Sequence, residues 1–125
     1  MSDHIFSFEK LEAWKESRIL AKEIYILTKG FPAEEKYGLC QQIRRSSISV
    51  CSNIAEGTSR SSAKDQAHFT TMAFGSLMEL LNQIIIAFDL HYLTEKQLNF
   101  LRNLIQPLSI KLSNLKKSQL SRLNS

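Results

Sequence analysis

The residues best placed to do chemistry are polar side chains at helical spacing in the first half of the chain. Arg45, Ser49, Asn53 and Glu56 follow one another at spacings of 4, 4 and 3, so on a helix they share one face. Glu79 is expected to approach this face from a neighbouring antiparallel helix. Two interpretations stay open. One is a buried hydrogen-bonded network that fixes packing register, and the other is an arginine surface for phosphate.

The cations form a second set of candidates. The net charge is +4, and residues 91–125 hold six cations but one anion, so the excess lies toward the C-terminus. A basic surface suits nucleic acid or an anionic membrane, although cations at the end of a helix are also common where they are simply solvated. The residues that we expect to contact phosphate are Arg44, Arg45, Arg60, Lys111, Lys116, Lys117 and Arg122.

Catalytic and metal-binding patterns are weak in this sequence. Asp65 and His68 share a helix face, but a di-iron bundle needs two Glu-x-x-His pairs and two further glutamates. Cys40 and Cys51 lack a nearby histidine that would activate a thiol nucleophile, and the glycines form no phosphate-binding loop. We therefore predict a protein that is not an enzyme, with no catalytic residue, no metal and no cofactor.

Length and composition predict one soluble unit. The chain has 125 residues with four glycines and two prolines, which favours helices over a fold of many short strands. The longest apolar run, Ile84 to Phe88, is far shorter than the roughly 18 residues that span a membrane. The first residues do not resemble a signal peptide, and two cysteines suit reduced thiols. We expect a cytoplasmic protein with no membrane partner.

Apolar residues at helical spacing mark four segments. We expect helices at about 9–29, 33–56, 62–90 and 94–115. Gly30 and Gly57 provide stops for the first two, whereas Ser62 and Thr94 provide N-caps for the last two. Four helices with short connections predict an all-α, antiparallel, up-down-up-down four-helix bundle.

Three features refine this bundle. Gly75, inside the third expected helix, predicts a close helix crossing, and Pro107, inside the fourth, predicts a kink near Asn103. Polar residues after Leu115 predict a flexible basic tail over about 116–125. The bundle itself is then expected over about 8–115, within a single domain of 1–125.

Surplus apolar and small residues predict self-association. The first helix carries two apolar stripes side by side, which is more than one amphipathic surface helix requires. The second contains the small-residue strip Ser46 to Ser52, which allows another backbone to approach closely. A face buried against copies of the same chain would account for both.

Five motifs along the chain carry a resemblance to a known family. They are Phe8-x-x-Leu11-x-x-Trp14, Ile24-Tyr25-x-Leu27-Thr28-x-x-Phe31-Pro32, Glu35-x-x-Gly38-Leu39-x-x-Gln42-Ile43-Arg44-Arg45-Ser46, Ser49-x-x-x-Asn53-Ile54-Ala55-Glu56-Gly57 and Gly75-Ser76-Leu77-x-Glu79-Leu80. Together they resemble the S23-type four-helix bundle family, whose members include proteins encoded within intervening sequences of bacterial 23S rRNA genes. The resemblance covers about residues 6–112.

The resemblance implies an antiparallel four-helix bundle that assembles as a ring-like homopentamer. A similar bundle occurs in the accessory protein of diversity-generating retroelements, a basic barrel that binds a reverse transcriptase and nucleic acid. This chain departs from the family pattern in two places. The usual Glu-Gly-x-Gly-Arg loop reads Glu56-Gly57-Thr58-Ser59-Arg60, and the usual Glu-Leu-Glu reads Glu79-Leu80-Leu81.

These observations predict a non-enzymatic, homo-oligomeric bundle that binds RNA or DNA non-specifically through phosphate contacts. A pentamer would multiply the +4 of one chain fivefold, and clustered charge of that size creates a strong field. The alternative is a structural scaffold or protein-interaction module that binds a partner protein and has no nucleic-acid role. In that case Asn53, Glu56 and Glu79 serve the fold alone.

Overall fold

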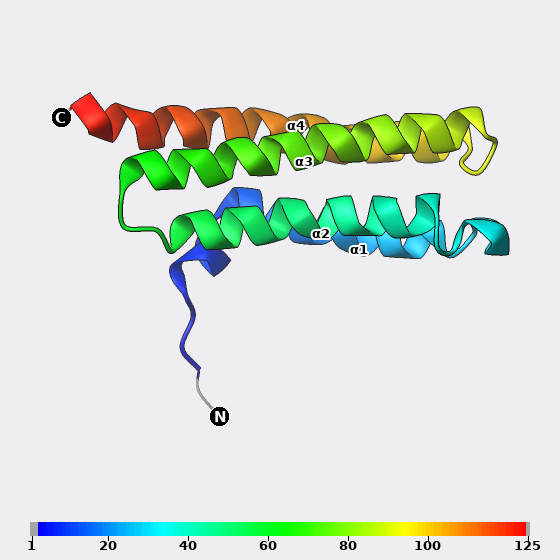
Figure 1. Cartoon of the computed structure of the whole chain (residues 1–125), viewed down its shortest axis with the longest axis horizontal. Coiled ribbons are helices and arrows are strands. Elements are labelled where there is room, and N and C mark those ends of the chain that lie inside the picture. Colours follow the sequence, from blue (N-terminus) through cyan, green and yellow to red (C-terminus); the bar gives the residue numbers. More distant parts are fainter. Residues whose placement is uncertain (1–2, 125) are drawn as a thin grey trace.

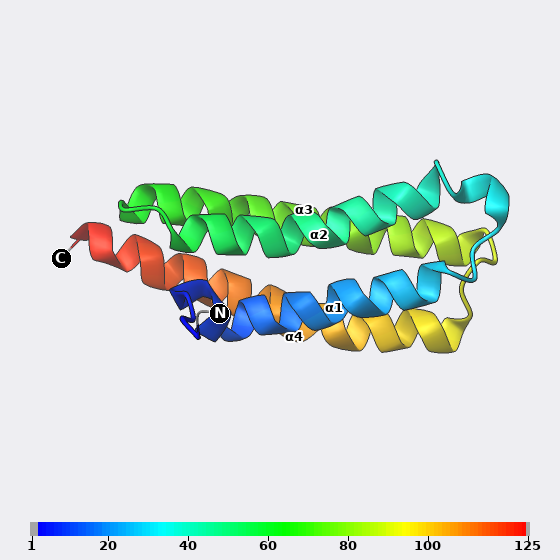
Figure 2. The same cartoon turned by 90° about the horizontal axis from the view of Figure 1, so that it is seen from below.

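The computed structural model describes residues 3–124. All of the regular secondary structure in these residues is helical. Successive long helices run in opposite directions and lie side by side along their length (Figures 1 and 2). Within residues 3–124 there is no strand. The long helices are α1 (Glu12–Thr28), α2 (Leu39–Thr58), α3 (Ala63–Asp89) and α4 (Glu95–Ser121), and the 3₁₀ turns are Ser7–Lys10, Ala33–Glu35 and Arg122–Asn124.

A single apolar core lies between the four helices. α1 and α3 each contact α2 and α4, so the helices form a closed square around it. Each buried aliphatic side chain favours folding by about 1.5–3 kcal/mol relative to an exposed one. The largest fully buried side chains come from all four helices: Leu20, Ile24, Ile43, Val50, Leu77, Leu80, Ile84, Leu101, Leu108 and Leu112.

The N-caps of the last two long helices are confirmed. The Ser62 hydroxyl accepts a hydrogen bond from the backbone N–H of Asp65 at the start of α3. At the start of α4, Thr94 accepts from the backbone N–H of Gln97, whose side chain accepts from the backbone N–H of Thr94. These bonds satisfy backbone donors that the first turn of a helix leaves without a partner.

The expected start of the second helix is wrong, and its end lies two residues beyond the expected position. Residues 33–35 form a 3₁₀ turn, and α2 begins only at Leu39, because Gly38 adopts φ −111° and ψ −115°, outside the helical region. At the other end α2 continues through Gly57 to Thr58. A Cβ at Gly57 would lie 2.8 Å from Cβ of Phe69, so this glycine permits close packing of α3 instead of stopping α2.

The predictions made for Gly75 and Pro107 have different outcomes. The close crossing expected near Gly75 and Ser76 does not involve Gly75, because a Cβ built there would meet nothing within 4 Å, whereas the Ser76 hydroxyl lies 2.9 Å from that of Ser49 on α2. Pro107 lies inside α4 on an exposed position, and the helix continues past it. Figure 2 shows that α4 changes direction along its length, as an interior proline predicts.

The C-terminal segment is helical where the sequence predicts a flexible tail from about Lys116. α4 extends to Ser121, and a 3₁₀ turn follows over Arg122–Asn124. Gln119 is 5% exposed, and its side-chain carbonyl accepts a 2.7 Å hydrogen bond from the hydroxyl of Thr70 on α3. The prediction failed because a glutamine with a buried partner can occupy a core position. Ser125 lies outside the described residues.

By length and composition, α3 is apolar enough to cross a membrane. A long helix of a bundle passes the same test when one of its sides is apolar and faces the core. In α3 that side is formed by Ala73, Leu77, Leu80, Ile84 and Ala87, each fully shielded by the other helices.

Candidate nucleic-acid interface

Two arginines from distant parts of the sequence meet at one end of the bundle. Arg60 follows α2, and Arg122 follows α4. Gln66, in the second turn of α3, lies between them: its side-chain amide donates a 2.8 Å hydrogen bond to the backbone carbonyl of Arg60, and its carbonyl accepts from the guanidinium of Arg122. This end is the left-hand one in Figure 1, where the α2–α3 connection and the C-terminus lie.

The side chain of Arg60 is exposed and lies over an aromatic ring. Its guanidinium carbon is 4.6 Å from the centroid of the Phe69 ring, a cation–π geometry that holds the plane of the guanidinium in place. Among the described residues, no acceptor forms a hydrogen bond with this guanidinium. Its donors therefore face solvent, where they are available to the oxygens of an anion.

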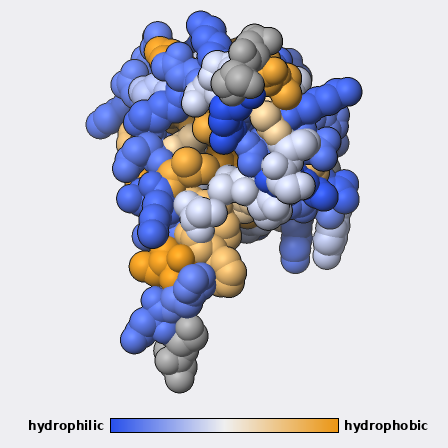
Figure 3. Space-filling model, turned by 90° about the vertical axis from the view of Figure 1, so that its left-hand side faces the viewer, coloured by the Kyte–Doolittle hydropathy of each residue, from blue (hydrophilic) through white to orange (hydrophobic). Residues whose placement is uncertain are grey.

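Further cations surround this pair. Lys64 on α3 and Lys117 on α4 are exposed near the same end. We call Arg60, Lys64, Lys117 and Arg122 the basic end. Two exposed carboxylates, Glu56 and Asp65, lie close in sequence to these cations and offset part of the charge. Figure 3 looks onto this end and shows hydrophilic residues around most of its periphery.

Arg44 has a structural role in the α1–α2 contact. Its Nε donates a 2.8 Å hydrogen bond to the hydroxyl of Thr28, and one terminal nitrogen donates to the backbone carbonyl of Tyr25 at 3.3 Å. Its guanidinium also lies 4.7 Å from the centroid of the Tyr25 ring. Because these contacts occupy the guanidinium, we leave Arg44 out of the candidate interface.

The remaining predicted cations lie elsewhere on the bundle. Lys111 pairs with Glu16 across the α1–α4 contact. Arg45 is exposed on α2. Lys116 is half-buried and lines a hollow between α3 and α4. The structure therefore brings together Arg60, Lys117 and Arg122 from the predicted set. Lys116 is next to Lys117 but faces the hollow, whereas Arg44, Arg45 and Lys111 lie away from this end.

The expected polar track does not form one buried network. Asn53 donates to the backbone carbonyl of Ser49 at 2.9 Å, and the Ser49 hydroxyl bonds that of Ser76 at 2.9 Å. Glu79 accepts from the Gln83 amide on its own helix at 3.2 Å. Arg45, Glu56 and Glu79 are all exposed, so the interpretation of these residues as an interior track is wrong. Charged side chains of this kind are rarely buried without a partner.

The buried polar contacts involve glutamines that the sequence reasoning did not select. The hydroxyl of Ser46 donates to the carbonyl of Gln83 at 2.9 Å, and Thr70 bonds Gln119. Among the described residues that are not exposed, every fully buried side-chain nitrogen and oxygen has a hydrogen-bond partner. Both glutamines occupy positions that the helical spacing of apolar residues assigns to the core. This spacing could have identified them from the sequence. Gln66 carries no such signal, because its role depends on two other segments.

The cysteines and acidic residues show no reactive arrangement in the described chain. Cys40 is buried and Cys51 is half-buried, and both are free thiols. Burial raises the pKa of the Cys51 thiol above its ordinary value, which disfavours the reactive thiolate. Within residues 3–124, no group of three or more His, Cys, Asp or Glu side chains is placed to hold a metal ion.

The fold and the basic end define a protein of the all-α four-helix class. Comparison with known families goes further: the model of the 23S rRNA-intervening sequence protein family matches residues 9–114. The chain therefore belongs to the 23S rRNA-intervening sequence protein family, as the sequence motifs predict.

A solved structure supports the fold. A protein of unknown function from the S23 ribosomal protein family of Bacteroides thetaiotaomicron is similar with a TM-score of 0.78 and 24% sequence identity. The similarity covers 84% of this chain and 95% of that one. No curated protein matches this chain.

Proposed function

We propose that this antiparallel bundle binds RNA or DNA through phosphate contacts at the basic end, without enzymatic activity. The observation that carries the proposal is the meeting of Arg60 and Arg122 at Gln66. Arginine presents a planar fork of donors that matches two phosphate oxygens at once, and two such forks on one rigid surface suit consecutive phosphates.

This interface favours binding without sequence preference. Sequence is read through base edges or by stacking of bases on exposed aromatic rings. At the basic end the ring of Phe69 is half-buried, and one of its contacts is the guanidinium of Arg60. The surface therefore offers charge more than a stacking platform, and phosphate contacts dominate the binding energy.

Self-association would strengthen such binding. We propose a ring-like homo-oligomer, a pentamer as the family resemblance implies, in the cytoplasm. Each copy supplies the same two arginines, so several copies on one strand neutralise several phosphates. Affinity would then depend steeply on salt, because each neutralised phosphate of duplex DNA contributes a slope of about −0.9 in log affinity against log salt.

Fluorescence anisotropy with a short labelled duplex, over a series of salt concentrations, tests the proposal. We expect a linear fall in log affinity with log salt for the wild type. The double variant Arg60→Glu/Arg122→Glu should bind on the order of tenfold more weakly or worse at low salt, since it loses two phosphate contacts per copy and gains repulsion.

The matched control is Lys29→Glu/Lys96→Glu, which also reverses two charges, at exposed positions after α1 and in the first turn of α4, at the opposite end of the bundle. This control should change affinity far less than the Arg60→Glu/Arg122→Glu variant. Equal weakening by both variants would show a general charge effect and would refute a site at the basic end. Thermal unfolding of each variant verifies that the fold is retained.

A scaffold function is the second candidate, and a specific observation favours it. The outer surface between α3 and α4 is hollowed and has an apolar floor that includes Met78, Leu81 and Ile105. Such a surface suits a protein partner better than a phosphate backbone. An oligomer that ignores nucleic acid at every salt concentration would favour this candidate.

A further inference from the structure

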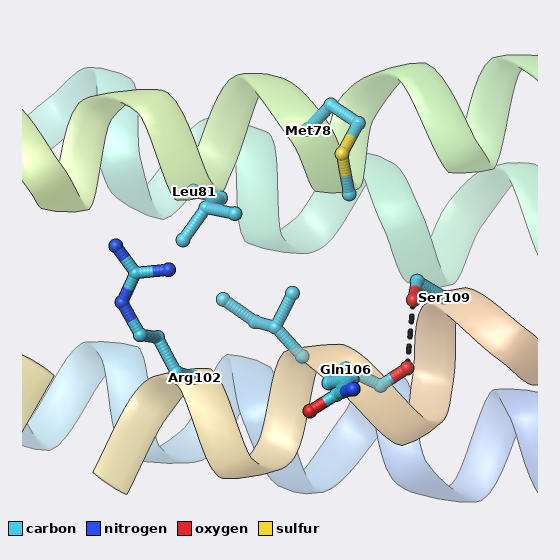
Figure 4. Close-up of a pocket in the computed structure, with 6 residues that line it drawn as sticks. Met78, Leu81, Arg102, Gln106 and Ser109 are labelled. Carbon is cyan, nitrogen blue, oxygen red and sulfur yellow. Dashed lines mark hydrogen bonds between the residues drawn. The ribbon is translucent and has the colours of Figure 1, made fainter. Parts of the chain in front are cut away.

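A groove with a basic wall runs along the outside of the bundle between α3 and α4. Its central hollow has a volume of about 260 Å³, with Met78 and Leu81 on the α3 side and Arg102, Ile105, Gln106 and Ser109 on the α4 side. Figure 4 shows the Arg102 side chain extending from α4 toward Leu81. Arg102 is exposed and has no acidic partner among residues 3–124.

The groove continues toward the basic end. A second hollow of about 200 Å³ lies next along the same two helices, lined by Phe74 and Thr70 on α3 and by Leu112 and Lys116 on α4. On α3 the apolar side chains Phe74, Met78 and Leu81 follow at spacings of 4 and 3, so they form one stripe. The whole surface, which we call the α3–α4 groove, is therefore an apolar strip with Arg102 and Lys116 along it.

The N-terminal arm, residues 3–6, carries two large apolar side chains that lie outside the core of its own bundle. Ile5 is 54% exposed and Phe6 is 62% exposed. The backbone N–H of Phe6 donates a 2.8 Å hydrogen bond to the carboxylate of Glu9, which caps the first 3₁₀ turn and fixes where the arm leaves. Figure 1 shows the arm pointing away from the bundle on the side of α1 and α2.

The arm cannot reach the groove of its own chain. Four extended residues span about 14 Å at most, at roughly 3.5 Å per residue. The turn that follows the arm packs against α1 and α2, whereas the groove lies on the far side of the bundle, beyond helices each about 10 Å in diameter. Any groove that this arm fills belongs to another molecule.

We propose that the N-terminal arm of one copy docks in the α3–α4 groove of a second copy. Ile5 and Phe6 cover the apolar stripe of Met78 and Leu81, and the carboxylate of Asp3 lies near the cationic wall that Arg102 provides. The arm offers apolar side chains and a negative charge, and the groove offers an apolar floor and a positive charge. Burying two large apolar side chains supplies the driving force.

Arm-in-groove docking has a consequence for symmetry. The arm and the groove are different surfaces, so the contact is heterologous, and repeated heterologous contacts close into rings or extend as filaments. The inference thus deepens the self-association part of the proposed function and rests on it. It adds the segment and the surface through which one copy holds the next.

Cross-linking between two singly labelled populations tests the contact. In a background of Cys40→Ala/Cys51→Ala, one population carries Phe6→Cys and the other carries Leu81→Cys. A short bis-maleimide reagent should give a covalent dimer when the two are mixed. Neither population should give it alone, and Phe6→Cys mixed with Tyr37→Cys, an exposed position in the α1–α2 connection, is the matched control.

Light scattering gives the second readout. We expect Ile5→Asp/Phe6→Asp to lower the mass toward the 14.3 kDa of one chain, whereas Tyr37→Asp, at an exposed position in the α1–α2 connection, leaves the mass of the wild-type oligomer unchanged. The arm variant should still unfold cooperatively, because these side chains lie outside the core.

The outcomes separate the two proposals. An oligomer that gives no arm-to-groove product, or that keeps its mass in the arm variant, would overturn the docking and leave self-association standing. A wild-type protein that stays monomeric at every concentration would overturn both the docking and the self-association. Nucleic-acid binding is measured independently, so a ring held by arms that ignores duplex DNA would refute the proposed function alone.

Discussion

The two ends of the bundle use their polar side chains in different ways. At the end that carries the α1–α2 and α3–α4 connections, the hydroxyl of Tyr92 donates a 3.0 Å hydrogen bond to the carboxylate of Glu35. The ring of Tyr92 also packs on Phe31, with centroids 5.4 Å apart. This closed end joins its two connections through contacts within the chain.

At the basic end an uncharged glutamine and an aromatic ring hold two arginines in place. Gln66 bonds the backbone of Arg60 and the guanidinium of Arg122, and it carries no charge. Phe69 supports Arg60 through its ring. Both ends are held by contacts within the chain, and the closed end carries an exposed cation of its own, Lys36 over the ring of Tyr37, but the basic end gathers arginines from two distant segments around one glutamine. That gathering of arginines is the physical reason for placing the interface there.

The largest expected change in stability comes from the close packing behind the basic end. Gly57→Ala places a Cβ 2.8 Å from Cβ of Phe69, so α2 and α3 must separate or the ring must move. We expect the free energy of unfolding to fall by about 1–2 kcal/mol, as overpacking commonly does. Because Phe69 supports Arg60, nucleic-acid affinity should fall as well. Denaturant unfolding and anisotropy measure the two effects.

Gly75→Ala is the matched control, because it makes the same change in α3 where nothing lies within 4 Å of the new Cβ. Alanine is the better helix former, so this variant should be more stable by about 0.5–1 kcal/mol. Equal effects at the two glycines would contradict the close approach of α2 and α3 at Gly57.

A smaller effect at the closed end depends on pH. The hydrogen bond to Glu35, with burial and the nearby negative charge, raises the pKa of Tyr92 above its ordinary value near 10. The unfolded chain therefore releases this proton first as pH rises, so the stabilisation is complete below about pH 10 and is lost above it. Tyr92→Phe should have a lower melting temperature than the wild type at neutral pH. Its melting temperature should also fall less steeply than that of the wild type as the pH rises above about 10.

Thermal melts of both proteins from pH 7 to 11 measure that difference. Nucleic-acid affinity at pH 7 should be unchanged in Tyr92→Phe, since the closed end takes no part in binding. A loss of affinity without a loss of stability would contradict the division between the two ends.

The smallest expected effect is at Lys111, which lies between the two ends. Its ion pair with Glu16 leaves 43% of the lysine side chain and 25% of the glutamate side chain exposed. Partly exposed ion pairs of this kind contribute about 0–1 kcal/mol to stability. We expect the free energy of unfolding of Lys111→Met to lie within about 0.5 kcal/mol of the wild-type value. Its effect on duplex binding should also be small. A loss comparable to that of the Arg60 and Arg122 variant would extend the interface along α4.

The sequence by itself determined the local features of this protein. Helical spacing located four helices, and Ser62 and Thr94 with Gln97 marked the starts of α3 and α4, because capping depends on residues within one turn of each other. The motifs also identified the family. Of the candidate interface, composition singled out Arg60 and Arg122 as cations, without indicating that they lie together.

Only the tertiary structure decided which residues share a surface. Arg60 and Arg122 meet because α3 places Gln66 between the ends of two other helices. The sequence predicts a helix stop at Gly57 and a close crossing at Gly75, but in the structure Phe69 packs on Gly57 and open space surrounds Gly75. The helix continues from Lys116 to Ser121, where the hydroxyl of Thr70 donates a hydrogen bond to the buried side-chain carbonyl of Gln119. Each of these outcomes depends on a neighbour distant in sequence, and helical periodicity reports only on neighbours within a few turns.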